Sequence, residues 1–203
     1  RSGTSAGPGS TVRIDTEDDG PLRQFTGAYE QPVAGGKLRL NTFLYIDRVK
    51  FEEDDVDTIT GAASTYDEIN PNSTRELGAN FSRPLSPRTQ LELVGLWQRN
   101  GFGVAGVSSG PDGRETFDVD RVSRETIARA VVKRTWAPAF ATELGAEAAR
   151  NRLRSASRFQ ADGVDVPLPA ADVGVRERRA ELFAKASWRV APAWSLDGQI
   201  RYE

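Results

Sequence analysis

Apolar and polar residues alternate along several stretches of the chain, most clearly in Lys37–Asp47. Every even position from 38 to 46 holds Leu, Ile or Thr, whereas most odd positions are polar or charged. A period of two places successive side chains on opposite faces of a strand. A soluble sandwich would bury the apolar face, whereas a membrane barrel would turn it to lipid and line a watery lumen with the polar face.

Composition removes most classes of function. The chain has 203 residues without Cys or His, which excludes disulfides, thiolate chemistry, the usual zinc sites and imidazole catalysis. The 27 Lys and Arg nearly balance the 29 Asp and Glu, so no nucleic-acid partner is expected. No apolar run approaches the roughly 18 residues of a transmembrane helix. Because Met is also absent, we expect residue 1 to be an internal point of a processed or truncated chain.

The connections between the predicted strands have two lengths that alternate along the chain. Residues 1–20 are rich in Gly, Ser, Thr and Asp and are predicted to be loop or disordered, and residues 21–203 carry the strand pattern. Short turns are predicted near residues 31–36, 83–88, 137–141 and 189–193. Long loops are predicted near residues 48–72, 100–122 and 153–174. All short turns would therefore lie at one end of the sheet.

This regularity favours an all-β, antiparallel, up-and-down transmembrane β-barrel, present in part as about eight strands of a larger barrel. Outer-membrane barrels have short periplasmic turns and long extracellular loops. Trp136, Trp188 and Trp194 lie beside short turns, where an aromatic girdle would meet the periplasmic interface. In the Lys37–Asp47 strand, we expect Leu38, Leu40, Leu44 and Ile46 to face lipid, and Lys37, Arg39 and Asp47 to face the lumen.

Several segments also resemble the barrel of TonB-dependent outer-membrane receptors. They are Phe25–Glu30, Thr142–Glu147, Asn151–Leu153, Glu177–Ala184, Ser187–Arg189, Trp194–Leu196 and Ile200–Glu203. The resemblance lies in strand patterns that cover most of the chain, without a single invariant motif.

The resemblance implies a bacterial outer-membrane protein with a barrel of about 22 strands, plugged by an N-terminal domain. It also implies active uptake of a scarce ligand such as an iron chelate, with energy passed on by the TonB protein. The expected partners are outer-membrane lipid, a plug domain, the remaining barrel strands, TonB through an N-terminal region absent here, and a small-molecule ligand of unknown identity. No plug is recognised before residue 20, so the chain is interpreted as an internal section of the wall. A soluble β-rich binding module and a porin or adhesin barrel stay as alternatives.

No catalytic, cofactor or metal site is predicted. Acidic pairs such as Glu143 and Glu147, or Glu177 and Glu181, would share a strand face. Their expected partners in cross-strand ladders are basic residues on the same or neighbouring strands, namely Arg150, Arg152, Arg179 and Lys185. The acidic Glu52–Asp57 segment could bind calcium, although a solvated loop is the favoured reading.

Ligand contact is expected from the long loops, because loops on a rigid scaffold carry recognition. The candidates are the loop aromatics Phe51, Tyr66, Phe102, Phe117 and Phe159. They could grip a ligand or pack loop on loop. An iron chelate, a corrinoid and a glycan fragment all stay open as the ligand.

Overall fold

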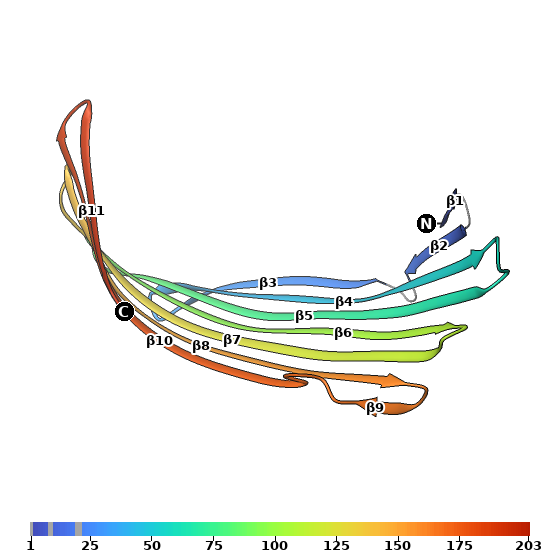
Figure 1. Cartoon of the computed structure of the whole chain (residues 1–203). Helices are drawn as coiled ribbons and strands as arrows, with labels where there is room; N and C mark the ends of the chain where they lie inside the picture. Colours follow the sequence, from blue (N-terminus) through green and yellow to red (C-terminus); the bar gives the residue numbers. More distant parts are fainter. Residues whose placement is uncertain (1, 8–9, 19–21) are drawn as a thin grey trace.

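The computed structural model describes residues 2–7, 10–18 and 22–203, and these residues form one curved, all-β antiparallel sheet (Figure 1). The strands are β1 (Ser2–Gly7), β2 (Ser10–Asp18), β3 (Arg23–Val33), β4 (Gly36–Asp57), β5 (Ala63–Ser86), β6 (Thr89–Gly110), β7 (Gly113–Ala137), β8 (Phe140–Ala161), β9 (Val164–Val166), β10 (Asp172–Ala191) and β11 (Trp194–Tyr202). No helix in the described part of the chain has the length and apolar character needed to cross a membrane.

The strands follow one another up and down in sequence order, and the sheet is open. The central path runs β1-β2-β4-β5-β6-β7-β8-β10-β11, while β3 pairs with β4 and β9 pairs with β8. Both β2 and β3 lie along the same edge of β4, with β3 beside residues 36–46 and β2 beside residues 49–57. The strands β3 to β8, β10 and β11 correspond to the eight predicted strands, and β1, β2 and β9 are additional.

At one end of the sheet, two-residue turns join the strands at residues 34–35, 87–88, 138–139 and 192–193. Each turn lies inside a segment predicted as a short turn. Ala34 and Gly35 both have positive φ, of 50° and 72°, as a type I′ hairpin turn requires. At the other end, the connections are residues 58–62, 111–112 and 162–171, the last containing β9. We refer to these two ends as the short-turn end and the long-hairpin end.

The prediction of long loops at 48–72, 100–122 and 153–174 was wrong, because most of these residues continue the strands. Backbone pairing is nearly continuous from β4 to β8. It supplies hydrogen-bond partners for the backbone N–H and C=O groups whichever side chains the strands carry. Polar residues suit such strands when both faces meet water. Pro71 removes one donor, and the β5–β6 ladder is interrupted around it and again by a register shift between Pro84 and Ser86.

The prediction of loop or disorder for residues 1–20 was also wrong where the structure describes them. Ser2–Gly7 and Ser10–Asp18 form β1 and β2, and β2 continues the pairing of β4 beyond the end of β3. The exposed edge of β4 offers unpaired backbone N–H and C=O groups to another strand. Hydrogen bonding to this edge outweighs the preference of Gly, Ser and Asp in this segment for turns. Residues 1, 8–9 and 19–20 lie outside the described residues.

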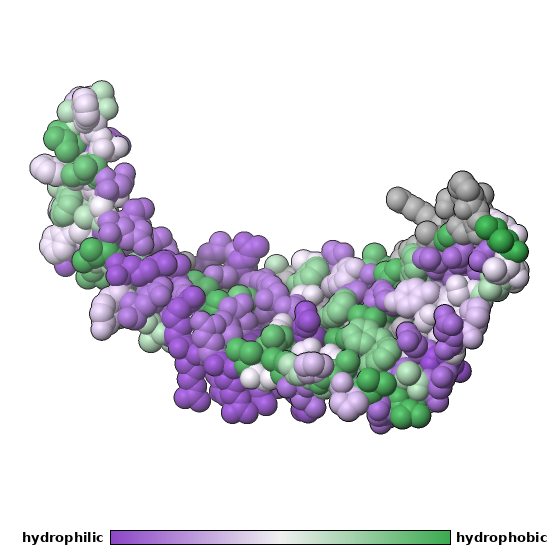
Figure 2. All heavy atoms as spheres, in the orientation of Figure 1, coloured by the Kyte–Doolittle hydropathy of each residue, from purple (hydrophilic) through white to green (hydrophobic). Residues whose placement is uncertain are grey.

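The two faces of the sheet differ in both chemistry and exposure. We call the face that carries Leu38, Leu40 and their cross-strand partners the outer face, and the opposite one the inner face. On the outer face, Leu144 is 59% exposed and Leu182 is 61% exposed. Among the described residues, the only buried apolar ones besides glycine are Val131, Ala149 and Phe183, and all three lie on the inner face. Figure 2 accordingly shows hydrophobic side chains spread over the surface of the sheet.

The expected faces of the Lys37–Asp47 strand follow this division. Leu38, Leu40, Leu44 and Ile46 lie on the outer face, and Lys37, Arg39 and Asp47 lie on the inner face. The inner-face Lys37 forms an ion pair with Glu30 of β3, with 2.6 Å between Nζ and Oε1.

Three tryptophans mark the short-turn end. Trp136, Trp188 and Trp194 are 49%, 50% and 75% exposed. The indole Nε1 of Trp136 donates a hydrogen bond of 2.9 Å to Oγ1 of Thr142, and the Arg134 guanidinium lies 4.0 Å from the ring centroid. Trp136 therefore combines an exposed ring with a polar edge that has a partner, as amphipathic aromatic residues commonly do.

Candidate ligand-contact surface

The five aromatics predicted to contact a ligand all lie on the inner face, in the half of the sheet toward the long-hairpin end. Strand pairing places them on one face although they come from five different strands, β4 to β8. We call them the aromatic cluster, which consists of Phe51, Tyr66, Phe102, Phe117 and Phe159. They lie on strands, so their positions are set by a backbone ladder and not by loop conformation.

Four members of the aromatic cluster come together. Phe117 and Phe159 are direct cross-strand partners, and the rings of Phe51 and Tyr66 meet edge to face with centroids 6.1 Å apart. Gly106 separates these two pairs along the row. A Cβ there would lie 3.3 Å from the Tyr66 hydroxyl, so the tyrosine covers the space that the glycine leaves. The result is a nearly continuous aromatic surface across β4 to β8.

Phe102 lies apart from these four residues. The guanidinium of Arg121 lies 6.0 Å from its ring centroid. The side chain is 39% exposed, and that of Phe117 is 40% exposed. Both rings therefore keep surface that a ligand could cover.

A carboxylate lies within the aromatic surface. Glu68 is the cross-strand partner of Phe51, accepts a hydrogen bond from the Tyr66 hydroxyl, and accepts a second one of 2.7 Å from Nδ2 of Asn70. The hydrogen bond to Glu68 favours the protonated phenol and raises the pKa of Tyr66 to about 12. Tyr66 is thus a hydrogen-bond donor held in place at all physiological pH values.

The inner face nearer the short-turn end carries ion pairs. Lys133 lies 2.7 Å from Glu92, and Arg179 lies 3.4 Å from Glu147, as expected for that pair. Glu181 is only 6% exposed, and Arg201 of β11 lies 2.9 Å from it. These inner-face charges are therefore paired across neighbouring strands.

Two of the basic partners expected for these acids were assigned wrongly. Arg150 and Arg152 lie on the outer face, because they are an odd number of residues from Glu147 on the same strand. Because successive residues of a strand alternate between the faces, the glutamates lie on the inner face and both arginines on the outer face. The arginines therefore cannot pair with these glutamates. The acidic segment Glu52–Asp57 is likewise divided between the two faces of β4, since it is a strand and not a loop. The described residues hold no group of three acidic side chains arranged to bind a metal.

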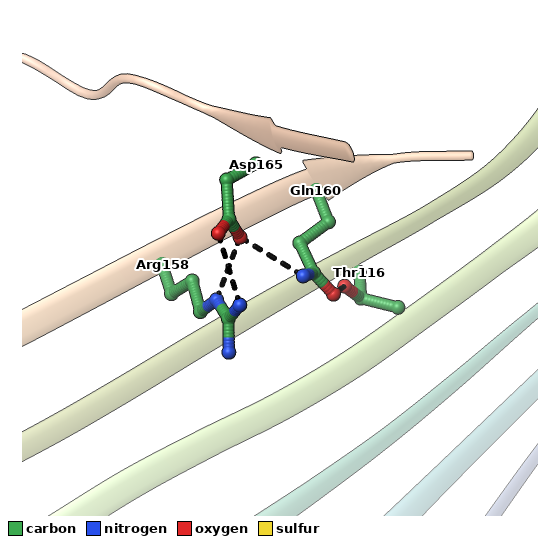
Figure 3. A network of polar contacts seen from close by, with 4 residues as sticks. All are labelled: Thr116, Arg158, Gln160 and Asp165. Carbon is green, nitrogen blue, oxygen red and sulfur yellow. Dashed lines mark hydrogen bonds and ion pairs between the residues drawn. The ribbon is translucent and has the colours of Figure 1, made fainter. Parts of the chain in front are cut away.

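A polar network fixes the β8–β9 hairpin on the outer face (Figure 3). Asp165 accepts two hydrogen bonds from Arg158, of 2.8 and 3.0 Å, and one of 2.9 Å from Gln160. Thr116 of β7 extends the network by donating to the Gln160 amide oxygen at 3.2 Å. The hydrogen bond from Arg158 is the main reason why the pKa of Asp165 is lowered.

Sequence reasoning missed a group of outer-face arginines. Arg150, Arg152 and Arg154 on β8, and Arg176 and Arg178 on β10, repeat with a spacing of two. That spacing was a visible signal that each set shares one face. It could not show that the two sets are neighbours across the sheet.

No known family profile matches the sequence, and no curated protein matches it either. Among solved structures, the chain is similar to the ferric yersiniabactin uptake receptor FyuA from Yersinia pestis, with a TM-score of 0.58 and 7% sequence identity. The match covers 94% of this chain and 28% of FyuA, so this chain spans about a quarter of the receptor's length. At this identity the likeness shows the fold alone, and the chain has the fold of part of a β-barrel.

Proposed function

We propose that the chain is part of the wall of an outer-membrane receptor barrel of the TonB-dependent type, which takes up a scarce ligand such as an iron chelate. The observation that carries the proposal is the distribution of exposed and buried side chains between the two faces. Aliphatic side chains are exposed on the outer face, whereas the buried carboxylate of Glu181 lies on the inner face. In water, such an arrangement would expose a large apolar surface without a partner. In a membrane, the same surface contacts lipid chains.

The length of the apolar surface supports this setting. Outer-face positions are apolar or small along about nine residues per strand, for example 38–46 on β4, 89–97 on β6, 140–148 on β8 and 180–188 on β10. A transmembrane strand tilted by about 45° needs roughly 9–11 residues. The strands themselves are much longer, 24 residues in β5, so the long-hairpin end would extend beyond the membrane.

The proposed orientation places the short-turn end in the periplasm and the long-hairpin end outside the cell. The aromatic cluster then lies on the lumen side of the extracellular half, where a ligand would arrive. Flat aromatic surfaces suit a ligand with aromatic rings. Because the Tyr66 hydroxyl donates its only proton to Glu68, its oxygen is left to accept a hydrogen bond from the ligand. A plug domain, the remaining strands and TonB would be supplied by the rest of the receptor.

Single cysteines test the faces and the orientation, because the chain has none of its own. Leu93→Cys lies on the outer face and Val94→Cys on the inner face of the same strand. In vesicles that contain the intact protein, a membrane-impermeant maleimide should label Val94→Cys several-fold faster than Leu93→Cys. A soluble module predicts the reverse, because the side chain of Leu93 is 40% exposed and that of Val94 is less exposed.

Orientation is tested on whole cells with the same reagent. Asp112→Cys, at a long-hairpin tip, should react in intact cells, and Ala139→Cys, in a short turn, should react only after the outer membrane is permeabilised. Labelling of Ala139→Cys alone in intact cells would show that the orientation is opposite to the proposed one.

Uptake of labelled ferric chelates should fall when Phe117 and Phe159 are both replaced by Ala. It should persist when Phe43 and Tyr45 are replaced, because this inner-face pair lies at the level of the apolar surface and away from the aromatic cluster.

A further inference from the structure

Five arginines form one cross-strand row on the outer face. The row runs from β5 to β10 through direct cross-strand partners, in the order Arg75, Arg99, Arg124, Arg152 and Arg176. We call these residues the arginine row. Three more outer-face arginines lie in the rows next to it, two residues along the same strands, namely Arg150, Arg154 and Arg178. On β5, β6 and β7 the row begins where the apolar or small outer-face positions end, on the side of the long hairpins, and on β8 and β10 the arginines Arg150 and Arg178 come first.

The arginine row has no compensating partner within the described part of the chain. No ion pair or hydrogen bond joins its side chains to another described residue, and four of the five are exposed, with Arg99 half-buried. Neighbouring strands are only about 4.8 Å apart, and like charges directly opposite each other destabilise a sheet. The outer-face acids that share cavities with these arginines, Asp118, Asp120 and Asp172, lie at least two rows nearer the hairpin tips, and no ion pair joins them to the row. The row therefore lowers the stability of the chain unless an anion binds to it.

The arginines also enclose a space of suitable size. A cavity of about 400 Å³ on the outer face is lined by Arg99, Arg124, Arg152 and Arg154, together with Asp120 and Val122. A guanidinium presents its N–H donors in a planar fork that binds two oxygens of one phosphate. Four such forks around one cavity can bind phosphate from several sides.

An apolar groove lies directly beside the row. It has a volume of about 660 Å³ and is lined by outer-face residues that include Tyr29, Leu40, Leu77 and Trp97. Leu77 and Trp97 are two residues from Arg75 and Arg99 on the same strands, and therefore occupy the next row of the same face. The groove is open along the sheet and carries few polar atoms. A chain of methylene groups fits such a surface, and a free phosphate ion would leave it uncovered.

We propose that the arginine row binds the phosphate groups of a phosphorylated lipid whose acyl chains lie on the apolar outer face beside it. The inference rests on the proposed function, because it needs the apolar face to be in a membrane. It goes further by assigning a head-group site to one leaflet, the one on the side of the long hairpins. The cationic row would also set the depth at which the wall lies in that leaflet.

The test uses the intact protein in a non-ionic detergent and measures binding of diphosphoryl lipid A through Trp fluorescence. We expect the double variant Arg124→Gln/Arg152→Gln to weaken binding by about tenfold or more, since each replacement removes charge-assisted hydrogen bonds. The control Arg39→Gln/Arg121→Gln removes the same charge from exposed positions of the inner face and should leave binding unchanged. Monophosphoryl lipid A should bind more weakly than the diphosphoryl form, and inorganic pyrophosphate should compete poorly.

A second measurement separates a binding role from a structural one. Without lipid A, Arg124→Gln/Arg152→Gln should raise the unfolding temperature or leave it unchanged, because it removes repulsion. A lower unfolding temperature together with weaker binding would indicate a structural role and overturn the proposal. Equal loss in both double variants, no loss in either, or full competition by pyrophosphate would also overturn it. If the protein stays monodisperse without detergent, the proposed function itself fails.

Discussion

Replacing Leu93 by Lys distinguishes a wall that faces lipid from a sheet that faces water. On β6 the apolar outer-face positions run from residue 89 to 97, and Leu93 is the central one. Eight steps of about 3.4 Å span roughly 27 Å along the strand, which a tilt of 35–45° reduces to roughly 20 Å. Leu93 would therefore lie about 10 Å from either boundary, near the midplane of the bilayer.

The expected cost follows from that depth. A lysine at the midplane of a barrel's lipid face lowers the free energy of unfolding by about 2–4 kcal/mol. Leu77→Lys, beside the arginine row, should cost about 0–1 kcal/mol, because it lies near the boundary. Val94→Lys, on the inner face next to Leu93, should also cost about 1 kcal/mol or less, since its charge would meet water.

Urea unfolding of the intact protein in lipid vesicles, followed by Trp fluorescence, measures these differences. The reasoning requires that Leu93→Lys lower the free energy of unfolding more than Leu77→Lys and Val94→Lys do. In a soluble sheet, substitution of a side chain that is 40% exposed would change stability by about 0.5 kcal/mol or less. A cost of that size for Leu93→Lys in vesicles would refute the placement of the outer face in lipid.

Three further predictions concern the inner face and the β8–β9 hairpin. Gly145→Ala should destabilise the protein by about 1–3 kcal/mol in thermal or urea unfolding, because its Cβ would overlap the aromatic ring of its cross-strand partner, whereas Gly95→Ala, with open space, should have little effect. Arg201→Gln should cost about 1–3 kcal/mol by leaving Glu181 buried without its cation, and adding Glu181→Gln should recover much of that loss; no recovery would mean that the charge is solvated. Because the pKa of Asp165 is lowered in the folded state, its stabilisation of the hairpin is present above pH 3.8 and is lost as the pH falls through the lowered pKa. Hydrogen exchange at residues 159–166 should show that acid dependence in the wild type but not in Asp165→Asn.

The arginines illustrate what sequence reasoning could and could not supply. Arg150, Arg152 and Arg154 recur with the strand period, so their common face could be read from the sequence. Arg150 and Arg152 were nevertheless predicted to pair with inner-face glutamates, although the strand period places them on the opposite face. Their alignment with Arg124 and Arg176 depends on the registers of two separate strand pairs. Register is a non-local property, and a shift of one residue would break the row.

The aromatic cluster shows the same division. Sequence reasoning predicted these five residues as ligand contacts, and it placed them in loops because Gly, Pro and acidic residues surround them. In the structure their segments are strands, held by pairing with neighbours that are far away in the sequence. Propensity is a weak guide where both faces of a strand are solvated and the ladder supplies the stabilisation.

By itself, the sequence determined the strand period, the chemistry of the two faces and the alternation of turn positions, since all three depend on residues close together in the chain. Only the tertiary structure decided how far the strands extend, which of the aromatics meet, and that five arginines from five strands form one row. These features depend on register and on sheet curvature, which arise when distant segments pair. The alternation in Lys37–Asp47 therefore predicted a wall with two different faces, and the pairing of the strands decided what each face can bind.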